Sequence, residues 1–317
     1  MKILLKDVYS PTYIQKLACR INFFYPPLRE KQFCNAIFTK EWDVLELKQR
    51  MSKITKVIYE YLPQDLTIAT PILLQVAPEF GGFHGMIFPH YFERFGQNNW
   101  ALSMQALETL TIYSSSEFAV RPFLQRHPKK MMKVMLKWST HQNEHVRRLA
   151  TEGCRPRLPW AMALPEFKKD PSLILPILEN LKDDPSEYVR RSVANNLNDI
   201  SKDNPATIIE IASQWYGKNE STNKLLKHAL RTMLKKGEPK ALDIFGLGKL
   251  NDVSVTTLVI KTNHPQIGQP LEFFFSIKNK RKKAITVRVE YCIYFLKKNN
   301  SHSRKIGSSH NSEQKFF

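Results

Sequence analysis

The amino-acid sequence predicts a mainly α-helical protein, a helical-repeat solenoid followed by a small β domain. From about residue 10 to residue 240, apolar residues recur with the helical period in segments of roughly 10 to 16 residues, separated by Pro, Gly, Asn and Asp. After Gly246 the period becomes two, in runs rich in β-branched and aromatic residues. We therefore expect a helical domain over residues 1–245 and a β domain over residues 246–317.

The helical part contains an internal repeat. Glu144-His-Val-Arg-Arg148 matches Glu187-Tyr-Val-Arg-Arg191 at an offset of 43 residues (187 − 144), and a weaker echo aligns Leu225–Met233 with Val189–Leu197. Self-similarity at this spacing, with two helices per unit, is typical of a HEAT-like solenoid, in which each unit buries one face on its neighbours. We therefore expect stacked helix pairs with one concave face.

The second copy of the repeat shows which residues that face presents. Every fourth residue of Val189–Leu197 is apolar and forms a buried stripe, and Asp184 or Ser186 can cap the start of the helix. Arg190, Arg191 and Asn195 fall outside the stripe, so we expect them on the concave face.

The connection Arg155–Pro165 differs from an ordinary link between two repeats. It holds three prolines, two arginines and Trp160. An ordered loop of this length often carries function. Trp160 either packs under the loop or lies against a sugar or base, because an indole in a basic groove offers a stacking surface.

Three strands are expected in the β domain, over Val253–Lys261, Leu271–Lys278 and Ala284–Leu296. A complete immunoglobulin-like sandwich has at least seven strands in about 100 residues. The sequence therefore predicts an incomplete immunoglobulin-like domain with open edges, followed by a disordered tail over Gly307–Phe317.

The chain is strongly basic, with 48 Lys and Arg against 29 Asp and Glu, a formal net charge of +19. Such a surplus favours polyanionic partners, nucleic acid first and an anionic membrane surface second. Ten basic residues lie in Arg121–Arg157, where Glu144 and Glu152 are the acids. The charge is thus concentrated in patches.

No cofactor or metal is expected. The four cysteines form no C-x-x-C pair, the nine histidines show no metal-ligand spacing, and the common nucleotide-binding and hydrolase motifs are absent. His84 and His90 flank an apolar run, where structural histidines with satisfied hydrogen bonds are favoured. Neither a signal peptide nor a membrane span is recognised, so nothing points to secretion or membrane insertion, and the cysteine usage fits a reducing cytoplasm best.

Carboxylates beside cations are the remaining candidates for chemistry. Glu117 precedes Arg121 by four residues, and Arg148 precedes Glu152 by four, so each pair shares a helix face if it is helical. Asp199 lies near a helix C-terminus, where the helix dipole disfavours an acid. Each of these groups is either a solvated surface residue or part of a site.

Three segments carry a family resemblance. Ser116–Phe123, Arg147–Trp160 and Asp184–Asp199 closely resemble the AlkC group of DNA alkylation repair glycosylases, and the likeness extends over nearly the whole chain. Members have a HEAT-like solenoid followed by an immunoglobulin-like domain, whereas the related AlkD group lacks the second domain. The resemblance implies a monofunctional glycosylase of base excision repair that removes 3-methyladenine, 3-methylcytosine and 1-methyladenine without base flipping and without a cofactor.

The resemblance also implies catalytic positions. Glu117 and Asp199 match the family's acidic residues, with Glu152 and Trp160 beside them. We expect the acids to stabilise an oxocarbenium-like sugar and to position a water, and the indole to pack against the sugar or lesion. The partner is then double-stranded DNA with alkylated bases, bound by a monomer without an obligate protein partner. The expected DNA contacts are Arg121, Arg147, Arg148, Arg155, Arg157, Arg190, Arg191, Lys280, Arg281 and Lys282.

Two alternatives remain open at this stage. A non-catalytic HEAT-repeat module would bind damaged or branched DNA with affinity that falls as salt rises, without base release. A protein-binding scaffold of the importin kind is less consistent with a concave face that carries mostly basic residues.

Overall fold

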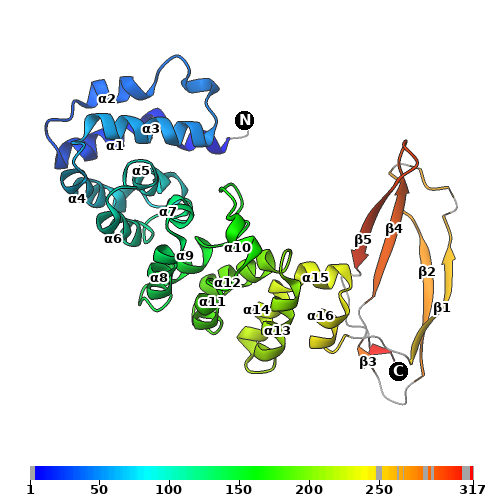
Figure 1. Cartoon of the computed structure of the whole chain (residues 1–317). Coiled ribbons are helices and arrows are strands. Elements are labelled where there is room, and N and C mark those ends of the chain that lie inside the picture. The colour runs from blue at the N-terminus through cyan, green and yellow to red at the C-terminus, as the bar shows by residue number, and fades with distance from the viewer. Residues whose placement is uncertain are drawn as a thin grey trace. The chain divides into compact units, whose positions relative to one another are not determined.

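The computed structural model describes residues 4–247, 252–262, 264–266, 268–280, 285–286, 289–308 and 315–316 (Figure 1). The chain divides into two compact units, Met1–Ala229 and Leu230–Phe317. All four cysteines are free. Within the described part of the chain, no helix is long and apolar enough to cross a membrane.

The N-terminal part of the first unit is a helical layer around an apolar core. Ile14, Leu17 and Ile21 recur on one face of the first helix and are fully buried. His90 links two packed helices, because its ring contacts Ser52 Oγ at 3.1 Å and Glu93 at 2.9 Å. The helices are α1 (Pro11–Phe24), α2 (Glu30–Ile37), α3 (Leu47–Tyr61), α4 (Leu66–Val76), α5 (Ile87–Phe95) and α6 (Trp100–Leu110).

The remaining helices of this unit form the predicted HEAT-like repeats. They are α7 (Arg121–Arg126), α8 (Pro128–Trp138), α9 (Glu144–Glu152), α10 (Pro165–Lys169), α11 (Leu175–Leu181), α12 (Glu187–Ile200), α13 (Pro205–Trp215) and α14 (Glu220–Ala229). Helix α9 packs on α12 and α12 on α14, whereas α8, α11 and α13 form the second layer (Figure 1). The predicted stripe Val189, Val193 and Leu197 is fully buried, so the period-four pattern identified the packed face correctly.

In its described residues, the second unit contains two short helices and three antiparallel strand pairs. Its elements are α15 (Arg231–Lys236), α16 (Pro239–Ile244), β1 (Val253–Ile260), β2 (Phe273–Asn279), β3 (Ile285–Thr286), β4 (Glu290–Leu296), β5 (His302–Ser308) and β6 (Lys315–Phe316). Strand β1 pairs with β2, β3 with β6, and β4 with β5. The Phe273 and Tyr291 rings, 5.1 Å apart, join the first and last of these pairs.

The prediction of three strands was wrong. The expected third strand is divided between β3 and β4, and β5 follows β4 through a turn in which Asn300 has a φ of 58°. Polar β5 lacks the β-branched pattern that identified the others. The expected disordered tail starts with two residues of β5 and includes β6, while 309–314 and 317 lie outside the described residues. The domain boundary at residue 245 stays a prediction.

Candidate active site

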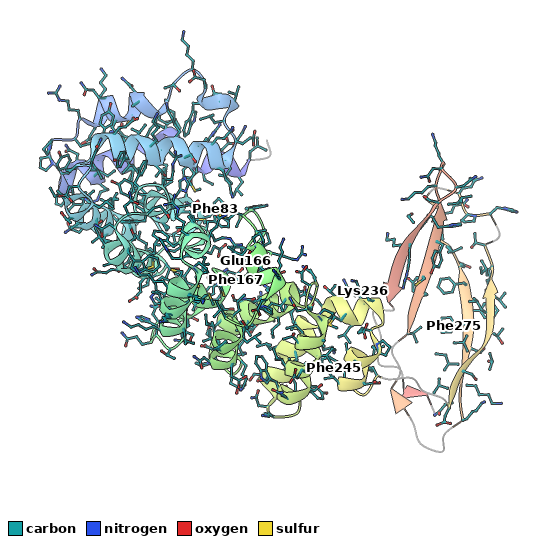
Figure 2. The ribbon with its side chains drawn as sticks, in the orientation of Figure 1. Phe83, Glu166, Phe167, Lys236, Phe245 and Phe275 are labelled. Atoms are coloured by element: carbon teal, nitrogen blue, oxygen red, sulfur yellow. The ribbon has the colours of Figure 1, made fainter. Side chains whose placement is uncertain are left out.

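A cavity of about 560 Å³ opens on the first unit where α9, α12 and the 155–160 segment meet the 82–86 and 111–118 segments. Aromatic rings form much of its wall, including Phe83, which is labelled in Figure 2. Charged side chains enter the same space from α9 and from the loops. The aromatic and charged lining residues are Phe83, Tyr113, Phe118, Trp160, Tyr188, Glu117, Glu152, His145, Arg148 and Arg155.

Glu117 lies in a turn that precedes α7, and its carboxylate faces the cavity. Its Oε2 accepts hydrogen bonds from Ser115 Oγ at 2.8 Å and from Arg148 Nη1 at 2.9 Å. The expected helical pair between Glu117 and Arg121 was therefore wrong. A helix has not begun at Glu117, so the spacing of four does not bring the two side chains together.

Glu152 ends α9 and is only 5% exposed. Its carboxylate accepts from Arg155 Nη1 at 2.6 Å and from Ser192 Oγ at 2.5 Å. Arg148 Nη2 lies 3.7 Å away, which confirms the predicted pair four residues apart. A buried carboxylate needs such partners, because an unpaired charge in the interior is costly.

Asp199 lies in the last turn of α12 and is 3% exposed, so its interpretation as a solvated helix end was wrong. Arg155 Nε donates to it at 2.9 Å and Lys202 Nζ lies at 3.2 Å. These two cations offset the unfavourable helix dipole. Asp199 is not among the residues that line the cavity; Arg155, which lines it, bridges Asp199 to Glu152.

The carboxylates change the electrostatics of the two arginines between them. Burial alone lowers the pKa of Arg148, but Glu152 and Glu117 outweigh it and the pKa is raised. The pKa of Arg155 is raised in the same way by Glu152 and Asp199, against the opposing effect of burial. The cluster therefore combines three carboxylates with two guanidinium cations and the Lys202 ammonium in a largely buried setting, where charges interact more strongly than in water.

Arg121 is too deeply buried for the DNA contact that the sequence predicted, so that prediction was wrong. It is 1% exposed, and its guanidinium donates to the carbonyls of Gly153, Arg155 and Met162, at 3.0, 3.0 and 2.7 Å. Burial lowers the pKa of Arg121 to about 10, still far above neutral pH. Arg121 therefore holds both ends of the loop rather than a phosphate.

Arg155 also departs from its expected role as a phosphate contact, because it is buried between Glu152 and Asp199. The guanidinium of Arg147 binds Asp184 at 2.6 and 3.0 Å, so it joins the two repeat copies. Arg147 and Arg155 therefore hold parts of the protein together instead of binding phosphates.

Of the other predicted DNA contacts, Arg157, Arg191 and Lys280 are exposed, whereas Arg148 is held in the carboxylate cluster. Arg157 binds Asp203 at 2.9 and 2.6 Å on the exposed part of the loop. Arg190 donates to two carbonyls before α12, whereas Arg191 is exposed and pairs with Glu187 at 2.9 Å. In the second unit Lys280 is exposed, and Arg281 and Lys282 lie outside the described residues.

Trp160 is 65% exposed and its φ is 62°, the left-handed region that a bulky residue rarely adopts. Holding it there costs about 1–2 kcal/mol. The indole and the Phe83 ring form a T-shaped pair, with ring centroids 6.4 Å apart. The indole therefore does not pack under the loop but lies at the rim of the cavity.

Sequence reasoning missed two aromatic residues, His145 and Tyr188, that line the cavity side by side with centroids 5.6 Å apart. The Arg148 guanidinium lies 4.8 Å from the Tyr188 ring centre. Burial raises the pKa of Tyr188, partly opposed by Arg148. The internal repeat could have identified them, because both residues directly follow its first glutamate, Glu144 in one copy and Glu187 in the other.

A second groove, of about 640 Å³, lies between α12 and α14. Besides Arg190 and Arg191 it is lined by Lys224 and His228, which the sequence analysis did not single out. Lys224 pairs with Glu220 at 2.7 Å on an exposed surface. The ion pairs that line this groove are exposed, whereas those of Glu117, Glu152 and Asp199 are largely buried.

Two family models match the chain, each over a different part. Residues 51–233 match the family model described as DNA alkylation repair enzyme, and residues 254–312 match the C-terminal Ig-like domain of YhaZ. The chain is 45% identical over 302 residues to the uncharacterized protein YhaZ of Bacillus subtilis (strain 168), covering 95% of this chain and 84% of that protein.

Among solved structures, the chain is similar to the Pseudomonas fluorescens alkylpurine DNA glycosylase AlkC bound to DNA containing an abasic site analog. The identity is 32% and the TM-score 0.90, over 99% of this chain and 86% of that one. These matches confirm the resemblance that the sequence motifs indicated. With its HEAT-like solenoid and Ig-like domain, the chain belongs to the DNA alkylation repair enzyme family.

Proposed function

We propose that this protein is a monofunctional DNA glycosylase that hydrolyses the N-glycosidic bond of cationic alkylated bases in double-stranded DNA. The observation that carries the proposal is the carboxylate cluster of Glu117, Glu152 and Asp199, held by Arg148 and Arg155 beside an aromatic-lined cavity. The similarity to an alkylpurine DNA glycosylase supports it. The expected substrates are 3-methyladenine, 3-methylcytosine and 1-methyladenine.

The chemistry of such a lesion fits this cluster. An N-alkylated base that carries a positive charge is already a good leaving group, so the reaction needs little acid catalysis. What it needs is stabilisation of the oxocarbenium-like sugar and an oriented water. Carboxylates in a partly dry cavity supply both, because electrostatic interactions are stronger there than in bulk water.

Each acid has its own part in this mechanism. Both hydrogen bonds that Glu117 accepts from the described residues use Oε2, so we assign Oε1 to the attacking water. Glu152 faces the cavity and adds negative charge near the sugar. Asp199 contributes its charge from behind Arg155, and that pair also fixes the orientation of Arg155 beside Glu152.

We assign DNA binding to exposed cations and not to the buried arginines. Arg191 and Lys224 in the α12–α14 groove, with Arg157 on the loop and Lys280 in the second unit, are the cations that we assign to phosphates. The exposed Trp160 at the rim of the cavity supports contact with a lesion that stays in the duplex, without base flipping. We place the enzyme in the bacterial cytoplasm, acting as a monomer.

Release of free base from methylated duplex DNA, measured by chromatography, tests the proposal. The wild type is expected to release 3-methyladenine, and Glu117→Gln and Asp199→Asn to lower the rate by about 10²–10³-fold. Glu210→Gln is the matched control, because this glutamate is exposed on α13 and lines neither the cavity nor the α12–α14 groove. Binding of damaged DNA without release from the wild type would favour the non-catalytic module instead.

A further inference from the structure

The loop that carries Trp160 is held at its base by Arg121. The guanidinium reaches the carbonyls of Gly153 and Arg155 at the start of the loop and that of Met162 near its end. A backbone bond from Leu164 N to the Pro156 carbonyl, at 3.2 Å, closes the same base. These contacts leave the tip of the loop to be fixed by other means.

Lys48 provides that second attachment. It lies on α3, 112 residues before Trp160, and its Nζ donates to the Trp160 carbonyl. The same ammonium lies 4.6 Å from the ring centre of Phe118, another wall of the cavity. Lys48 thus connects the N-terminal helices, the tip of the loop and the cavity wall.

The backbone of Trp160 needs such an attachment. A tryptophan with a φ of 62° and an indole 65% exposed has little packing of its own to hold it. A donor on the Trp160 carbonyl fixes the orientation of the peptide that follows the strained residue. It therefore fixes where the indole stands relative to Phe83 and the carboxylates.

We propose that Lys48 is a positioning residue, which together with Arg121 holds the loop so that Trp160 is aligned at the rim of the cavity. The inference rests on the proposed glycosylase function for its effect on rate. Lys48 acts through Trp160 and touches no reacting atom. Because the Lys48 side chain is exposed, its loss leaves the folding core intact, whereas Arg121 is buried and its variants are prone to unfold.

The test is Lys48→Met, with Lys56→Met as the matched control. Lys56 is exposed on the same helix and pairs with Glu60 at 3.5 Å, so its loss removes the same charge away from the loop. Base release under single-turnover conditions is expected to slow about tenfold in Lys48→Met, with DNA affinity within twofold. Lys48→Arg, which keeps a cationic donor, is expected to restore most of the rate.

Trypsin supplies a readout that does not depend on activity. The bond after Arg157 lies within the loop and is cleavable, whereas the bond after Arg155 precedes a proline and resists trypsin. Release of the tip is expected to speed cleavage after Arg157 about fivefold or more in Lys48→Met, with an unchanged urea midpoint. Mass spectrometry identifies the cut.

A double variant closes the test. In a Trp160→Ala background, Lys48→Met is expected to cause no further loss of rate, because both changes act through the same residue. Additive losses, equal losses in Lys56→Met, or unchanged cleavage after Arg157 would overturn the inference. Absence of base release from the wild type would instead remove the proposed function, while the cleavage rates still report whether Lys48 holds the loop.

Discussion

Helices α9 and α12 carry two copies of one repeat motif, yet their second arginines are in opposite settings. The Arg148 side chain is 18% exposed and is shared between Glu117 and Glu152. Its counterpart Arg191 is 67% exposed and pairs with Glu187 alone among the ion pairs found in the described part of the chain. The same residue at the same helical position is thus part of a buried cluster in one copy and of a surface pair in the other.

The difference arises from what surrounds each copy. The residue after one further turn is Glu152 in the first copy and Asn195 in the second. The 155–164 loop follows α9 and brings Arg155 to Glu152 and Trp160 to the cavity, whereas the chain after α12 passes through a short turn to α13. The repeat therefore sets which helix positions carry these side chains. The surrounding residues decide whether a carboxylate–arginine pair is buried enough for a strong electrostatic interaction.

Stability should separate the two copies most strongly. Arg148→Met leaves Glu117 and Glu152 without their shared partner and is expected to cost about 3–5 kcal/mol. Arg191→Met removes an exposed pair and is expected to stay within about 0.5 kcal/mol. Urea unfolding followed by circular dichroism measures both, and equal losses would contradict the comparison.

Exchanging the residues that distinguish the copies tests activity next. Glu152→Asn is expected to slow base release by about 10²–10³-fold, equivalent to about 2.7–4 kcal/mol. Asn195→Glu, the reverse exchange on α12, is expected to keep the rate within about threefold because it lies outside the cavity. Single-turnover rates, corrected for the folded fraction, give both values; a similar loss in the two variants would count against the assignment of Glu152.

For DNA binding, we expect the larger effects from the exposed cations of α12 and α14, and not from the buried arginines of α9. Arg191→Met and Lys224→Met each are expected to lower the slope of log affinity against log salt by about 1, with a few-fold weaker binding on any sequence. Arg147→Met is the control, because Arg147 is tied to Asp184 rather than free for a phosphate. Fluorescence anisotropy over a salt series measures the slopes, and an unchanged slope in Lys224→Met would remove the α12–α14 groove from the DNA interface.

The smallest effect concerns acid stability. A hydrogen bond from Arg157, opposed by slight burial, lowers the pKa of Asp203 below its usual value. A carboxyl with a lowered pKa stabilises the fold above the unfolded pKa of about 4, and this contribution is lost as pH falls through the folded value. Asp203→Asn is expected to cost under about 1 kcal/mol at pH 7 and less as the pH falls to about 2. Urea midpoints at both values measure it, and an equal cost at pH 2 would exclude a charge effect.

Much of the fold could be predicted because it depends on local pattern. The helical period, the repeat at offset 43 and the change of period after Gly246 indicated the HEAT-like solenoid and the Ig-like domain. The pair of Arg148 and Glu152 followed from spacing on one helix. Strand β5 escaped prediction because its residues are mostly polar and its partner is found only through the turn at Asn300.

By itself the sequence determined the repeat and the family, and it singled out Glu117, Glu152 and Asp199 as candidate site residues. Only the tertiary structure decided that Arg121 points inward to three carbonyls, that Arg155 joins Glu152 to Asp199, and that Lys48 reaches the loop from another helix layer. The physical reason is range. Periodicity and spacing act within one element, whereas burial and pairing of charges depend on residues that the fold brings together from distant parts of the chain.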